Sequence, residues 1–87
     1  QDRGTRRCFA AIRSLAPDMP PEILRQRMML TLMFGLSAGA SMEAAAKDQE
    51  VWKNLWGQPS ARSNLADTMA GIILAPVSDE TLMMLES

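Results

Sequence analysis

The residue types that enzymes use for chemistry are scarce in this chain. It contains no histidine, so the commonest general base and metal-ligating side chain is missing. Cys8 is the single cysteine, and it has no histidine partner and lies on the apolar side of a predicted helix, which favours a buried structural thiol. A lone cysteine forms no internal disulfide and gives no sign of an oxidising compartment, so we expect a cytoplasmic protein.

Two pairs of neighbouring carboxylates remain as candidates for acid–base chemistry. Asp48 and Glu50 lie in a predicted loop, and Asp79 and Glu80 lie in the first turn of a predicted helix. Solvated charge explains the first pair, and interaction with the positive end of a helix explains the second. No glycine-rich phosphate loop is present. The sequence therefore predicts no catalytic residue, no metal site and no cofactor, and we do not expect an enzyme.

The charge of the chain bears on its partners. Its formal net charge is −1, which gives no general electrostatic attraction to nucleic acid. Arg3, Arg6, Arg7 and Arg13 gather near the start, and we interpret them as a solvated helix face. The chain does not begin with Met and shows no signal-peptide pattern, and we expect it to be a fragment whose N-terminal part is absent.

The elements that must position these residues are all predicted to be helices. The hydrophobic content of 47% excludes a disordered tail, and no strand pattern appears. We expect residues 1–87 to form a single helical domain fragment. In it, Pro21 suits the first helical position, and Ser60 and Ser78 suit the capping position before later helices. The predicted helices are 3–14, 21–46, 61–75 and a short one at 79–86, with a loop at 47–60 that holds a helical turn pinned by Val51, Trp52, Leu55 and Trp56.

The predicted central helix, 21–46, is apolar on every side. No charge appears between Arg27 and Glu43, whereas a surface helix keeps a polar face. A helical wheel separates three apolar sides, of which one carries Gly35 and Gly39, a second carries Met29 and Met33, and the third carries Ile23, Leu30 and Phe34. Because so short a chain has few elements to cover such a helix, we expect a second copy, missing sequence or lipid to complete the cover.

The central helix also contains a GxxxG motif, Gly35 to Gly39. In a long apolar span this motif marks a transmembrane dimer. Here the uncharged stretch Met28–Met42 is shorter than the roughly 20 residues that a bilayer requires. Glu43 closes this stretch without a Lys or Arg anchor, and no aromatic belt flanks it. We therefore expect close packing against another soluble helix and no membrane partner.

Two segments resemble the C-terminal, effector-binding domain of TetR-family transcriptional regulators. The segment PPEILRQR is similar to the start of the penultimate long helix in that family, and NLADTMAGIILAPVS is similar to its last helix. The resemblance covers about residues 20–80. It implies an all-α fold in which two antiparallel helices form half of an intersubunit four-helix bundle. The dimer-interface residues that we predict on these two helices are Leu24, Met28, Leu32, Gly35, Gly39, Leu65, Met69, Ile72 and Ile73.

The same resemblance implies a function. The chain would be the dimerisation and effector-binding part of a bacterial repressor, and it would control a missing N-terminal DNA-binding domain through an apolar small-molecule effector. In the family the inducer pocket lies largely among earlier helices. We expect one wall of it here, formed by Met29, Met33, Phe34 and Leu36. The alternatives are a stand-alone helical protein–protein interaction module and a small membrane-associated helix dimer.

Overall fold

The computed structural model describes residues 3–86, with all their side chains except those of Thr5, Cys8 and Phe9. The expected burial of Cys8 therefore lies outside the described side chains. The predicted all-α class is confirmed: the structure is 79% helical, and no strand occurs in the part of the chain that it describes. Five helices follow one another: α1 (Arg3–Leu15), α2 (Pro21–Ala46), α3 (Glu50–Trp56), α4 (Ala61–Leu74) and α5 (Asp79–Leu85).

The ends of α2 follow from local chemistry. Pro20 precedes the helix with an extended backbone (φ −56°, ψ 136°), and Pro21 occupies the first helical position, where its missing N–H has no partner to lose. At the other end the chain reverses at Asp48, whose φ is +63°. Aspartate tolerates this left-handed conformation better than most residues. The reversal places α3 beside the C-terminal end of α2, within the segment expected to be a loop.

The two predicted serine caps behave differently. The side chain of Ser78 accepts a hydrogen bond of 3.2 Å from the backbone N–H of Thr81 and caps α5 as expected. Ser60 precedes α4 but has a helical backbone, and its side chain makes no capping bond. The expected cap at Ser60 is therefore wrong, because a residue that already has helical φ and ψ cannot turn its side chain back onto the first turn.

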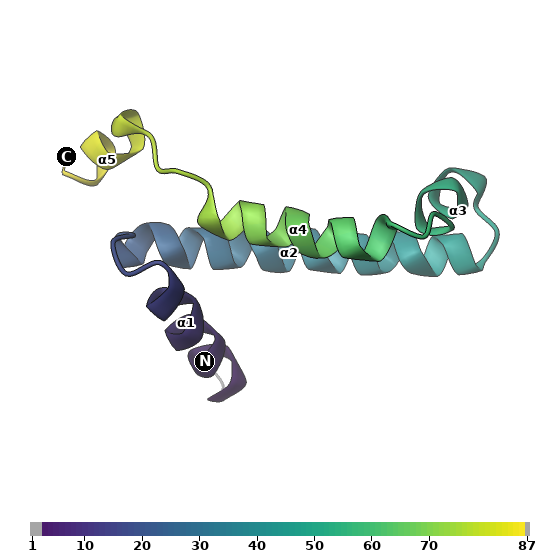
Figure 1. Cartoon of the computed structure of the whole chain (residues 1–87), viewed down its shortest axis with the longest axis horizontal. Coiled ribbons are helices and arrows are strands. Elements are labelled where there is room, and N and C mark those ends of the chain that lie inside the picture. Colours follow the sequence, from purple (N-terminus) through teal and green to yellow (C-terminus); the bar gives the residue numbers. More distant parts are fainter. Residues whose placement is uncertain (1–2, 87) are drawn as a thin grey trace.

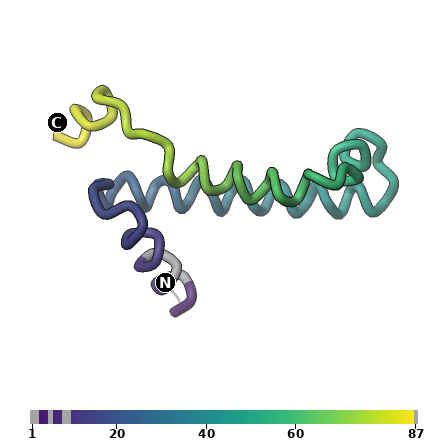
Figure 2. The backbone as a smooth tube through the Cα atoms, viewed as in Figure 1, coloured from purple at the N-terminus to yellow at the C-terminus, as the bar shows by residue number. Residues whose placement is uncertain are grey.

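The structure is organised around a hairpin of α2 and α4, which run antiparallel and side by side over most of α4 (Figure 1). α3 lies across the closed end of this hairpin, while α1 and α5 leave from its open end (Figure 2). The fully enclosed core of the described residues is small: Ile23, Leu24, Ala38 and Ala61. A core of this size leaves most apolar side chains in contact with solvent.

The hairpin decides which side of α2 is covered, and it corrects part of the predicted interface. Leu24 is 0% exposed, so its assignment to a dimer interface is wrong. A Cβ added at Gly35 would lie 3.7 Å from the Cε of Met69, so Gly35 faces α4 of the same chain. The side of α2 that contains Leu24 and Gly35 was predicted to meet a second copy, but in the structure this side is covered within the chain itself.

The remaining predicted interface residues divide between the hairpin and solvent. On α4, a half-buried stripe lies along the helix; it consists of Leu65, Met69, Ile72 and Ile73. On α2, Met28 is half-buried, whereas Leu32 and Gly39 are exposed. No atom lies within 4 Å of a Cβ added at Gly39. The GxxxG motif therefore uses only its first glycine inside the hairpin.

Candidate functional site

The side of α2 opposite α4 is apolar and open to solvent. We call it the outer face of α2, and it consists of Met29, Leu30, Leu32, Met33 and Leu36. Each of these side chains is more than half exposed, and Met33 and Leu36 reach 62% and 68%. Contiguous apolar surface of this kind is typical of a site where another macromolecule binds.

Three of the residues predicted to form an effector-pocket wall lie on this outer face. Met29, Met33 and Leu36 are exposed there, and only Phe34 of the four lines a cavity, the one between α2, α3 and α4. These three residues therefore do not line this cavity, and their place in a pocket wall stays a prediction. A helix that is apolar all round gives no polar side from which to infer its rotation, so the sequence could not separate these residues from those facing the hairpin.

A cavity of about 480 Å³ lies between α2, α3 and α4. It opens where α3 crosses the end of the hairpin. Three aromatic side chains form much of its wall, and small residues of α2 and α4 form its floor. The apolar residues that line it are Phe34, Ala38, Ala40, Trp52, Leu55, Trp56, Ala61 and Leu65.

Trp56 is the most firmly held part of this wall. Its indole Nε1–H donates a hydrogen bond of 2.8 Å to the hydroxyl oxygen of Ser41, and that hydroxyl donates one of 2.7 Å to the carbonyl of Ala38. This chain of bonds fixes α3 onto α2. Gly57 follows the last residue of α3. A Cβ at this position would lie only 2.8 Å from the carbonyl oxygen of Lys53, so a residue with a side chain would not fit without a shift of the backbone.

The polar lining of the cavity is uncharged. It consists of Ser37, Ser41, Asn64 and Thr68. Thr68 donates a hydrogen bond of 2.8 Å to the carbonyl of Asn64, whereas the side chains of Ser37 and Asn64 have no hydrogen bond among the described residues. The cavity therefore offers free polar groups but no ionic partner. Across residues 3–86, no cluster of three carboxylate, cysteine or histidine side chains is arranged to hold a metal ion.

Arg27 is a further important residue, and the sequence analysis did not single it out. Its guanidinium donates hydrogen bonds to the carbonyls of Ile73 (2.8 Å), Ala75 and Pro76 (3.3 Å). These are carbonyls at and just beyond the C-terminal end of α4, which the helix itself cannot satisfy. Arg27 thus fastens the open end of the hairpin. The available signal was an arginine that directly precedes the uncharged stretch of α2, together with a predicted helix that is stopped by Pro76.

Comparison with known proteins adds no relative to this picture. The chain matches no protein-family model, no curated protein and no solved structure.

Proposed function

We propose that this chain is the dimerisation and effector-binding part of a TetR-like bacterial transcriptional repressor that acts in the cytoplasm. DNA binding belongs, in this proposal, to a helix-turn-helix domain outside these residues. The observation that carries the proposal is the outer face of α2, a continuous apolar surface on the longest helix of an antiparallel hairpin. The order of the helices and the two family-like segments support the assignment to a repressor.

The exposed area of the chain supports a second copy as the partner. The surface is 6737 Å², whereas the scaling of area with mass gives about 5,100 Å² for a compact protein of this size. The excess is roughly 1,600 Å², about twice what one partner buries in a standard interface. The Cα radius of gyration, 15.8 Å, also exceeds the roughly 12 Å of a compact chain of this length. These dimensions suit a subunit of an obligate dimer.

The hairpin also suits a specific kind of dimer. Two antiparallel helices that leave an apolar face open could associate with the same pair from a second copy into a four-helix assembly. Apposing the outer faces of α2 from two copies would bring the two α2 helices together, with each α4 on the far side of its own α2, and would cover the surface that the chain leaves open. In the resulting repressor, an effector would favour one arrangement of the two subunits and thereby separate the two DNA-reading domains.

Sedimentation of the wild type and of Met33→Asp tests the proposal. We expect the wild type to be a dimer at micromolar concentration. The variant places an unpaired charge in the apposed apolar face, so we expect dimerisation to weaken by at least about 100-fold. Ser63→Asp is the matched control, because it adds the same charge at an exposed position of α4 and should remain dimeric. A wild-type chain that is a stable monomer would contradict the proposal.

A membrane-associated helix dimer is the second candidate, because one observation favours it. Among the described residues α2 is long and apolar enough to cross a membrane, and α4 with α5 would add a second such span if the bend of 51° between them were accepted. The core helix of a soluble protein meets the same criterion, but such a helix is mostly buried, whereas the apolar window of α2 is not.

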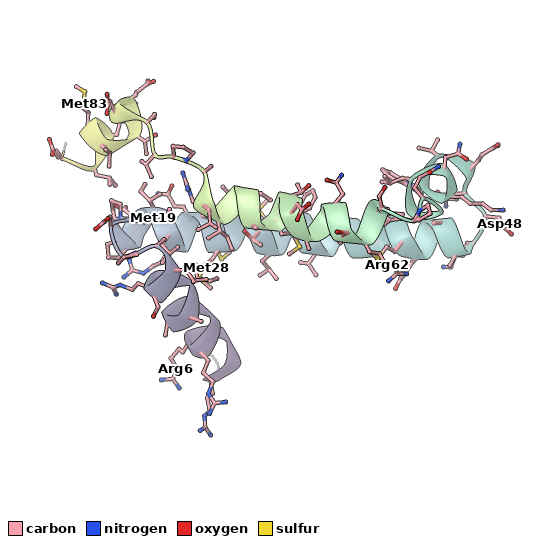
Figure 3. All side chains as sticks on the ribbon, in the orientation of Figure 1. Arg6, Met19, Met28, Asp48, Arg62 and Met83 are labelled. Atoms are coloured by element: carbon pink, nitrogen blue, oxygen red, sulfur yellow. The ribbon has the colours of Figure 1, made fainter. Side chains whose placement is uncertain are left out.

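The position of α4 argues against this second candidate. α4 lies along α2 and carries Arg62, which is labelled in Figure 3. Arg62 and Asp67 of this helix are both exposed. Inserting the hairpin would carry both charges into lipid, at a cost of about 2.5–3.5 kcal/mol for each charge near the bilayer centre. Retention of the chain in carbonate-washed membranes would favour the membrane candidate, whereas its recovery in the supernatant is the result that we expect.

A further inference from the structure

We propose that the cavity between α2, α3 and α4 binds one uncharged aromatic molecule of one or two rings that carries a hydroxyl or carbonyl group. The binding itself does not depend on the proposed function. Only the identification of the bound molecule as the effector of a repressor rests on it. The volume of about 480 Å³ lies within the range of about 300–1,000 Å³ that is typical of small-molecule sites.

The walls favour a flat ring. Phe34 from α2 and Trp52 and Trp56 from α3 line the cavity, and aromatic side chains stabilise a bound ring through stacked or edge-to-face contacts. Trp56 is held by its hydrogen bond to Ser41, so this part of the wall exists before a ligand arrives. Trp52 is 40% exposed, which leaves its ring available to a ligand.

The polar lining selects an uncharged ligand. Asn64 and Ser37 have side-chain groups without a hydrogen bond among the described residues, and the carboxamide of Asn64 can both donate and accept. No charged side chain belongs to the lining that the structure describes. An ionic ligand would therefore lose hydration without gaining an opposite charge, whereas a hydroxyl or carbonyl group would gain a hydrogen bond.

The cavity and the outer face of α2 are separate surfaces. No residue of the outer face lines the cavity. The cavity is lined instead by Phe34, Ser37 and Ala38, which lie on another side of α2. Apposition of two copies through the outer face thus leaves the cavity accessible. The cavity is uncharged and has polar groups without hydrogen bonds, and its volume is that of a small-molecule site. A small molecule is therefore the occupant that fits it.

The two tryptophans give a direct measurement. Both tryptophans of the chain line the cavity, so the two indole N–H signals in a nitrogen-15 NMR spectrum report on this site. We would titrate the full chain with 2-naphthol, naphthalene and 2-naphthoate. We expect both signals to shift with saturation on 2-naphthol. Its affinity should exceed that of naphthalene by about tenfold, as one hydrogen bond would give. 2-Naphthoate should bind the most weakly.

Three variants locate the binding. Thr68→Phe fills the cavity from α4 and should weaken the binding of 2-naphthol by at least about tenfold. Ser63→Phe is its matched control, because it replaces another exposed hydroxyl residue of α4 that does not line the cavity, and it should bind like the wild type. Asn64→Leu should remove the preference for 2-naphthol over naphthalene.

Several results would overturn the inference. Indole signals that stay unchanged up to the solubility of 2-naphthol, wild-type binding by Thr68→Phe, or tighter binding of 2-naphthoate would each do so. The outcome is distinguishable from that of the proposed function. A dimer that binds none of the probes contradicts the cavity alone, whereas a monomer that binds 2-naphthol supports the cavity and contradicts the repressor dimer.

Discussion

Individual side chains, rather than a large core, join the helices of this protein to one another. Arg27 bonds to three carbonyls at the end of α4, and Trp56 bonds to Ser41 at the other end of the hairpin. Between these ends the contact is apolar, as where Met69 lies against Gly35. Two polar connections therefore hold the ends of a hairpin whose enclosed core contains few residues.

Replacing Arg27 by Gln should destabilise the chain. The charged guanidinium satisfies carbonyls that the last turn of α4 leaves without partners. Hydrogen bonds to charged groups contribute about 1.5–3 kcal/mol each when buried. Two of these three are exposed, so we expect a total loss of about 1–2 kcal/mol after solvent competition. Urea unfolding measures this loss.

The control for Arg27→Gln is Arg25→Gln. Arg25 lies on the same helix, is exposed, and makes no hydrogen bond or ion pair among the described residues. Its substitution should leave the free energy of unfolding unchanged. Equal unfolding midpoints for the two variants would show that the Arg27 bonds do not contribute to stability.

At the scale of elements, the two sides of α2 differ in their surroundings. One side packs against α4 through Gly35 and its neighbours, and the other is the outer face that we assign to a second copy. Gly39 lies between these sides, and a Cβ there would meet no atom of the chain within 4 Å. The fold of the single chain therefore does not require a glycine at position 39, and only the close approach of a partner helix would require one there.

Gly39→Ala tests the element-scale description. Alanine is favoured over glycine inside a helix by about 1 kcal/mol, and the chain leaves room for the methyl group. We expect the variant to raise the melting temperature while sedimentation still shows a dimer. A variant that is more stable as a chain but monomeric would mean that the partner backbone approaches at the GxxxG motif instead of at the outer face.

At the scale of the whole molecule, the relevant properties are the elongated shape of the chain and its balance of charges. The chain extends 48 × 31 × 21 Å, with α1 and α5 projecting from the same end of the hairpin (Figure 1). Its arginine-rich α1 is balanced by acidic residues elsewhere, which brings the net charge to −1. Neither property provides the concentrated basic surface that DNA binding requires.

We therefore expect this chain to show no sequence-specific DNA binding. The arginines of α1 are few, and we interpret them as a solvated helix face and not as a recognition helix. Fluorescence anisotropy at about 150 mM salt, where weak electrostatic attraction is screened, should give the same weak signal for unrelated duplexes. Specific binding with a submicromolar dissociation constant would contradict this expectation and the division of labour in the proposed repressor.

The sequence by itself determined the helices of this protein and the apolar character of every side of α2. Proline and serine set the ends of helices through the backbone of their own neighbours, without help from distant segments. Pro21 therefore begins α2, Pro76 follows α4 and Ser78 caps α5, as predicted. Only the tertiary structure decided which side of α2 meets α4. A helix that is apolar all round has no polar side to fix its rotation, and so Leu24 is buried while Met33 is exposed. The cavity and the Arg27 bonds likewise depend on contacts between distant segments, which no local pattern encodes.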